Sequence, residues 1–122
     1  ELRKLRGIGP YFSRKIVEHR NRLGGFVSSD QLLEIWNFPV NTLDSIRPFL
    51  SLDTSIVNRL NINTCSADDF AAHPYLNYTK SHALVNYRTA HGDYNSVENI
   101  LDCKVISDSL FRKLKHYLVA HD

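Results

Sequence analysis

Apolar side chains recur along the chain at the spacing of three or four residues that is typical of one face of an α-helix. Phe12, Ile16 and Leu23 follow this spacing near the start of the chain, and residues 110–118 follow it near the end. No stretch alternates apolar and polar residues over the length of a strand, so we expect no strands. The pattern predicts an all-α fold.

Residues that favour helix ends separate these apolar segments. Gly24 and Gly92 stand where a helix should stop, and glycine can adopt the left-handed conformation of a C-cap. A serine followed three residues later by an acidic or amide side chain resembles a capping box, which starts a helix. This pattern occurs at Ser28 with Gln31, Ser66 with Asp69, and Ser96 with Asn99.

The chain contains an internal repeat. At an offset of 68 residues, residues 1–50 align without a gap with residues 69–118, and seven positions are identical. Apolar positions also agree, as in Ile16 with Leu84. We therefore expect two tandem modules of about four short helices each, over residues 1–50 and 60–122, with residues 51–59 as a linker.

Residues 2–17 read LRKLRGIGPYFSRKIV, with two glycines between two helical segments. This run resembles the helix-hairpin-helix motif, and both modules look like those of the competence-protein (ComEA-type) helix-hairpin-helix family. In the second module the lead-in LNINT at residues 60–64 adds to the likeness. The resemblance implies a SAM/HhH-like fold and binding of duplex DNA through phosphates, without sequence specificity.

The residues of this motif suit phosphate binding on physical grounds. We expect Gly7 and Gly9 to take positive φ in a tight turn and to let the backbone approach a ligand. Amides in that turn and in the helix that starts near Pro10 favour an anion. Residues 1–22 carry seven cations and two anions, which suits a phosphate partner. The predicted phosphate-binding residues are Arg6, Gly7, Ile8, Gly9, Arg14 and Lys15.

The second module departs from the motif at its hairpin, which reads Tyr75-Leu76-Asn77 and lacks both glycines. Bulk at Tyr75 would hinder the approach of a phosphate to the backbone. Residues 61–122 also carry six cations against seven anions, whereas residues 1–60 carry nine against six. We expect the second module to keep the fold and to have lost the site. The alternative function is a non-catalytic scaffold that contacts a protein partner through this module.

Other polar and aromatic residues are assigned structural roles. Arg20 and Arg88 recur at one repeat position, and acidic residues recur ten positions later, at Asp30 and Glu98. We expect structural ion pairs between them. Trp36 is expected to pack between helices rather than to stack on a base. The tyrosines of the second module, at positions 75, 78 and 87, are expected at the core and its rim.

The sequence lacks the features of several other classes of protein. No apolar run approaches the ~18 residues that cross a bilayer, so we expect no membrane contact in this segment. The six histidines lack metal-binding spacing, and no catalytic set or phosphate-binding glycine loop with Lys-Ser/Thr occurs, so we expect no metal, no cofactor and no enzyme activity. Cys65 and Cys103 are either free thiols or one disulfide. The chain begins at Glu1 without methionine, which indicates a fragment and leaves localisation unassigned.

Overall fold

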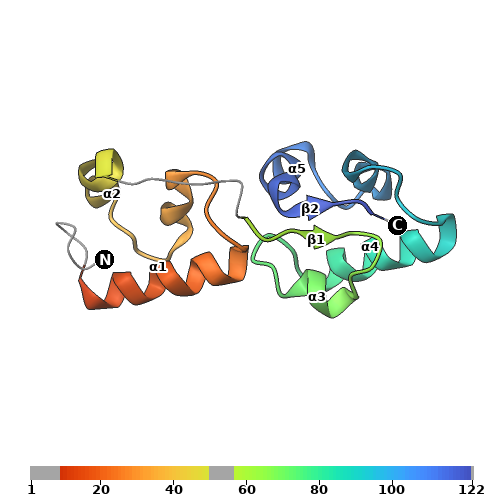
Figure 1. Cartoon of the computed structure of the whole chain (residues 1–122), viewed down its shortest axis with the longest axis horizontal. Coiled ribbons are helices and arrows are strands. Elements are labelled where there is room, and N and C mark those ends of the chain that lie inside the picture. Colours follow the sequence, from red (N-terminus) through yellow and green to blue (C-terminus); the bar gives the residue numbers. More distant parts are fainter. Residues whose placement is uncertain (1–8, 50–56, 122) are drawn as a thin grey trace. The chain divides into compact units, whose positions relative to one another are not determined.

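The computed structural model describes residues 9–49 and 57–121 of the chain, which divides into two compact units, Glu1–Val57 and Asn58–Asp122. Each unit is mostly helical (Figure 1). The prediction of an all-α fold is confirmed. No helix within the two described stretches is both long and apolar enough to span a membrane.

Unit 1 is built around one long helix, α1 (Pro10–Leu23). After it come the 3₁₀ helix η2 (Ser29–Glu34), helix α2 (Val40–Ile46) and the short 3₁₀ turn η3 (Arg47–Phe49). Their buried side chains form one apolar cluster, which places α1 against the two shorter helices. The cluster consists of Ile16, Leu32, Ile35, Phe38, Leu43 and Ile46, with Phe12 and Phe26 packed against it.

Unit 2 contains the complete motif of helix, turn and helix within the described residues. Helix α3 (Ala67–Ala71) is joined by a short turn to α4 (Tyr78–His91). The 3₁₀ helix η5 (Val97–Cys103), helix α5 (Asp108–Leu114) and the 3₁₀ turn η6 (Lys115–Tyr117) complete the helical part. Leu84, Ile100 and Leu114 are at most 1% exposed and lie at the centre of its core.

The repeat seen in the sequence is reproduced element by element. Helices α1 and α2 start and end 68 residues before α4 and α5, and η3 has the same relation to η6. The core follows the same offset, since Ile16 and Leu84 are 3% and 1% exposed. The prediction of two copies of one helical unit is confirmed for the parts of both copies that are described.

Local caps fix the helix ends as the sequence predicts. The Ser28 amide donates to Oε1 of Gln31 (3.1 Å), and the Ser96 amide donates to Oδ1 of Asn99 (3.0 Å). At the end of α1, Gly24 has φ 98° and its amide donates to the Arg20 carbonyl. This left-handed C-cap is where glycine carries no steric cost.

One expectation about secondary structure is wrong. Strands β1 (Leu60–Asn61) and β2 (Leu118–Val119) pair in parallel in unit 2. Asparagine side chains hold this short pair in place: Asn61 Oδ1 accepts from the His121 amide, and Asn63 Nδ2 donates to the His121 carbonyl. A pair of two-residue strands is too short to show alternation in the sequence.

Candidate nucleic-acid interface

Helix α1 begins without a side-chain cap. Its N-cap residue is Gly9, Pro10 takes the first helical position, and no side chain of the described residues caps the start. The Ser13 amide donates to the Gly9 carbonyl (2.9 Å), so the amides of Tyr11 and Phe12 are the donors left in the first turn. That turn contains no acidic residue. Open amides at the positive end of a helix favour an anion.

Helix α4 begins in a different way at the same repeat position. Asn77 lies 68 residues after Gly9 and is the N-cap of α4. Its Oδ1 accepts a hydrogen bond from the Lys80 amide at 2.8 Å. Lys80 corresponds to Phe12 in the repeat, so the amide that is open in unit 1 is occupied in unit 2 by a side chain of the protein itself.

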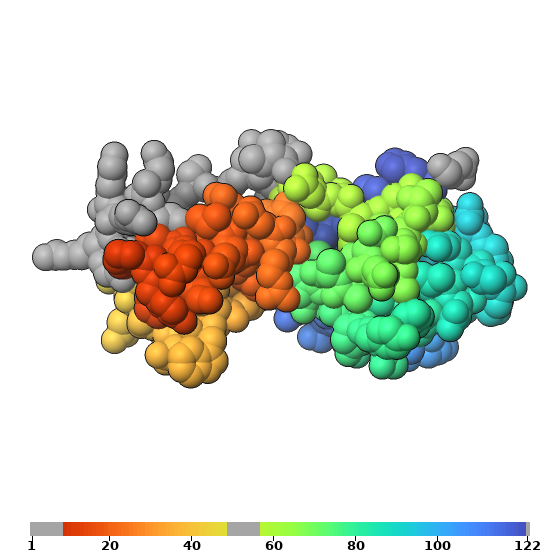
Figure 2. Space-filling view, turned by 90° about the horizontal axis from the view of Figure 1, so that it is seen from below, coloured from red at the N-terminus to blue at the C-terminus, as the bar shows by residue number. Residues whose placement is uncertain are grey.

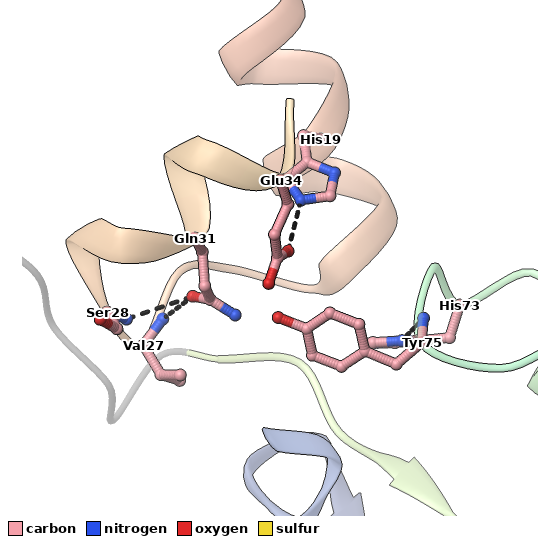
Figure 3. Close-up of polar contacts among 7 residues, drawn as sticks. All are labelled: His19, Val27, Ser28, Gln31, Glu34, His73 and Tyr75. Atoms are coloured by element: carbon pink, nitrogen blue, oxygen red, sulfur yellow. Dashed lines mark hydrogen bonds and ion pairs between the residues drawn. The ribbon is translucent and has the colours of Figure 1, made fainter. Parts of the chain in front are cut away.

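The turn before α4 is filled by aromatic side chains. Tyr75, which corresponds to Gly7, packs its ring against His73 and Tyr117, at centroid distances of 5.2 and 6.1 Å. The Lys113 ammonium lies 4.9 Å from the Tyr75 ring centroid. The Tyr75 amide also donates to Nδ1 of His73 (3.1 Å; Figure 3). Bulk therefore occupies this turn in unit 2, as the sequence predicts.

Cationic side chains gather on the first turns of α1, a helix that is broadly open to solvent in Figure 2. The Arg14 guanidinium and the Lys15 ammonium lie 5.8 and 5.6 Å from the Tyr11 ring centroid. Lys15 also approaches Glu18, with 3.4 Å between Nζ and Oε1. The exposed Tyr11 ring thus lies beside two of the predicted site residues, Arg14 and Lys15. Sequence reasoning missed Tyr11, although its spacing of three and four residues from these cations could have indicated it.

The structure places only part of the predicted site. Arg6, Gly7 and Ile8 lie outside the described residues, whereas Gly9, Arg14 and Lys15 lie together at the start of α1. The expectation of positive φ is wrong for Gly9, which has φ −93° and ψ −179°. This extended conformation is open to any residue because Gly9 is an N-cap and not the turn itself. A Cβ added at Gly9 would meet no atom of the described residues within 4 Å, its two chain neighbours aside.

The predicted ion pairs of the repeated arginines are wrong. Arg88 Nη1 donates to the carbonyls of Ile62 and Cys65, both at 2.9 Å. Arg20 is exposed and forms no ion pair within the part of the chain that the structure describes. Asp30 instead pairs with Arg47 (2.9 Å). The arginine of unit 2 therefore supports the backbone that leads into α3.

Trp36 does not pack between helices as expected, because it is 80% exposed. Ile35 and Phe38 on either side are buried, and their side chains occupy the core at this point. Asn37 takes φ 64°, which turns the chain between them. Tyr78 is likewise 68% exposed, and its ring contacts the His82 ring at a tilt (centroids 4.0 Å apart, planes at 42°). The sequence predicted Tyr78 at the core or its rim, and the structure places it outside both.

The cysteines are both free thiols. Burial raises the pKa of Cys65, and the nearby Asp69 carboxylate adds to the effect; burial also raises the pKa of Cys103. A raised pKa keeps a thiol protonated and unreactive near neutral pH. Among the residues whose positions are described, no group of three or more His, Cys, Asp or Glu side chains could hold a metal ion.

Comparison with protein families gives a match over both halves of the chain. The model of the helix-hairpin-helix motif matches residues 1–51 and again residues 56–119. The chain belongs to the helix-hairpin-helix family. Its two tandem units are thus two copies of a motif that generally binds nucleic acid.

Curated relatives are longer proteins. The chain is 26% identical, over 95% of its length, to the endonuclease/exonuclease/phosphatase family domain-containing protein 1 of Xenopus laevis. It is 22% identical, over 98% of its length, to the protein of the same name from Mus musculus. The chain spans about a quarter of the length of these relatives. No solved structure gives a significant match.

Proposed function

We propose that this chain binds duplex DNA through its phosphates, without base specificity and without catalysis, at the first helix-hairpin-helix. The proposed contacts are the backbone of residues 7–9 and the side chains of Arg6, Arg14 and Lys15. Backbone amides and cations recognise phosphate and carry no information about base sequence. The proposal includes the likeness to ComEA-type modules, which rests on the sequence motif.

The difference between the two helix starts is the observation that carries this proposal. In unit 1 no side chain of the described residues caps the first turn of α1, and a Cβ at Gly9 would meet none of their atoms within 4 Å. In unit 2 the Asn77 side chain already occupies the matching amide. Charge follows the same division, since Arg14 and Lys15 correspond to His82 and Ala83. A phosphate therefore finds the Phe12 amide and two cations in unit 1, whereas in unit 2 the matching amide is occupied and the matching residues are a histidine and an alanine.

A titration of a labelled duplex at several salt concentrations tests this function. If phosphates are bound, the logarithm of the affinity falls linearly with the logarithm of salt, by about 0.9 per phosphate neutralised. Replacing Arg14 and Lys15 together by Ala should lower the slope by at most about two contacts and weaken all sequences alike. The matched control replaces Arg112 and Lys113 of α5 by Ala, which removes the same charge from unit 2.

Two outcomes would contradict the proposal. Equal losses from the α1 and α5 double variants would show that net charge, and not the start of α1, governs binding. A chain that binds no duplex even at low salt would leave the scaffold interpretation as the better one.

A further inference from the structure

A shallow cavity lies beside Trp36 on unit 1. Its volume is about 190 Å³, and its lining comes from one face of α1 and from the end of η2 and the residues just after it. Two of its lining side chains, His19 from α1 and Glu34 from η2, point toward one another in Figure 3. The lining residues are Lys15, Glu18, His19, Arg22, Glu34, Ile35 and Trp36.

The charges around the cavity are paired except at one place. Glu18 lies 3.4 Å from the Lys15 ammonium. Nε2 of His19 lies 2.8 Å from Oε1 of Glu34. Arg22 is exposed and has no ion pair with any residue in the described part of the chain. An unmatched guanidinium and an open indole ring therefore border the same small hollow.

We propose that this cavity holds one unpaired nucleotide of a DNA strand, with its base stacked on Trp36 and its phosphate bound by Arg22. An aromatic ring beside cations is how proteins bind single strands, because every base offers a π-face and every nucleotide a phosphate. Bases inside a duplex are already stacked on one another and cannot reach the ring. The cavity would thus favour DNA that contains an unpaired segment.

The position of the cavity connects it to the proposed phosphate site, on which this inference rests. Lys15 lines the cavity and also lies beside Tyr11 at the start of α1. Arg22 follows Lys15 by seven residues, which is two turns, so both side chains lie on one face about 10 Å apart along the axis. A DNA strand bound at the start of α1 could therefore contact Lys15 and Arg22 before it reaches Trp36.

Unit 2 has none of these features at the matching positions. Lys15, Arg22 and Trp36 correspond to Ala83, Ala90 and Lys104 in the repeat. The two cations and the indole ring are therefore specific to the unit that carries the proposed DNA contacts. Unit 2 does offer an exposed aromatic side chain, Tyr78, which serves as a control.

Intrinsic fluorescence of the whole chain tests this inference, because Trp36 is the one tryptophan in the sequence. A short oligothymidylate should quench Trp36, and a blunt duplex of the same length should quench it much less. Trp36→Ala should weaken binding of the oligothymidylate about 5- to 150-fold, the range expected for one stacked base, with duplex affinity unchanged. Trp36→Phe should restore part of the loss, and Tyr78→Ala should cause none.

Arg22→Gln provides a second measurement on the same strand. It should reduce the salt dependence of oligothymidylate binding by about 0.7, the contribution of one phosphate contact on a single strand. If the duplex binds but the oligothymidylate neither quenches Trp36 nor depends on it, this inference is overturned and the proposed function stands. If neither DNA binds, both are overturned. Quenching that depends on protein concentration alone would assign Trp36 to contact between two copies of the chain and would also overturn the inference.

Discussion

Giving α1 the N-cap residue of α4, in the variant Gly9→Asn, should weaken DNA binding and raise stability. Gly9 has φ −93° and ψ −179°, and Asn77 has φ −128° and ψ 179°, so both caps use extended backbone that asparagine adopts freely. A Cβ at Gly9 would meet no atom of the described residues within 4 Å, so a side chain can be added there. In Gly9→Asn, the amide oxygen should therefore accept from the Phe12 amide, as Asn77 accepts from Lys80.

The sizes of the two effects follow from the hydrogen bond concerned. Asparagine exceeds glycine as an N-cap by a few tenths of a kcal/mol, so Gly9→Asn should raise the free energy of unfolding by about that amount. A hydrogen bond to a charged group contributes about 1.5–3 kcal/mol. If a phosphate oxygen uses the Phe12 amide, occupying that amide should weaken duplex binding by about 10- to 150-fold.

Urea denaturation and a fluorescence-anisotropy titration with labelled duplex would measure the two quantities. The matched control is Asn77→Gly, which should lower stability by a similar few tenths of a kcal/mol and leave duplex affinity unchanged. If Gly9→Asn gains stability and still binds the duplex as tightly as the natural chain, the first turn of α1 does not hold a phosphate.

Two further predictions concern unit 2. Arg88→Met should lower the free energy of unfolding by about 1–3 kcal/mol, because the carbonyls of Ile62 and Cys65 lose a charged donor; Arg20→Met should change it by less than about 0.5 kcal/mol in the same denaturation assay. Burial raises the pKa of the Cys65 and Cys103 thiols, so the folded state favours their protonated form. That stabilisation is present below the ordinary thiol pKa of 9.0 and is lost as pH rises through the raised values. Urea midpoints should fall above pH 9.0 in the natural chain, and less so in Cys65→Ala with Cys103→Ala; equal falls in both would contradict the assignment.

The helical fold and its repeat were predictable because the information is local and repeated. Helix caps depend on residues three positions apart, such as Ser28 and Gln31, and the apolar face depends on spacings of three and four. Two copies of the same pattern then reinforce one another. The start of α1 was predictable for the same reason, since Gly9, Arg14 and Lys15 lie within six residues of one another.

Features that depend on contacts distant in sequence were not predictable. Arg88 donates to carbonyls 26 and 23 residues away, and no pattern marks a backbone oxygen as a partner. The strand pair joins Leu60 to Leu118, and each strand has two residues. The exposure of Trp36 depends on which neighbour fills the core, and Ile35 and Phe38 do so from both sides. The expectation that Trp36 packs between helices is wrong for this reason.

The comparison of the two units separates what the fold requires from what the proposed site requires. The fold needs groups that are present, namely apolar side chains at matched positions, and Ile16 and Leu84 show that both units retain them. The proposed phosphate site needs cations, and it also needs a helix start that no side chain caps. A backbone amide can bind a ligand only if no side chain already accepts its hydrogen bond. In unit 2 the Asn77 side-chain oxygen occupies the Lys80 amide at the start of α4, and the Tyr75 ring fills the preceding turn. Asn77 and Tyr75 stand where unit 1 has Gly9 and Gly7. The first occupies a backbone amide and the second fills the turn, so each removes space or a donor that a phosphate would use. If the proposed function holds, a helix-hairpin-helix unit can lose its ligand when its own side chains satisfy its backbone, while its core is retained.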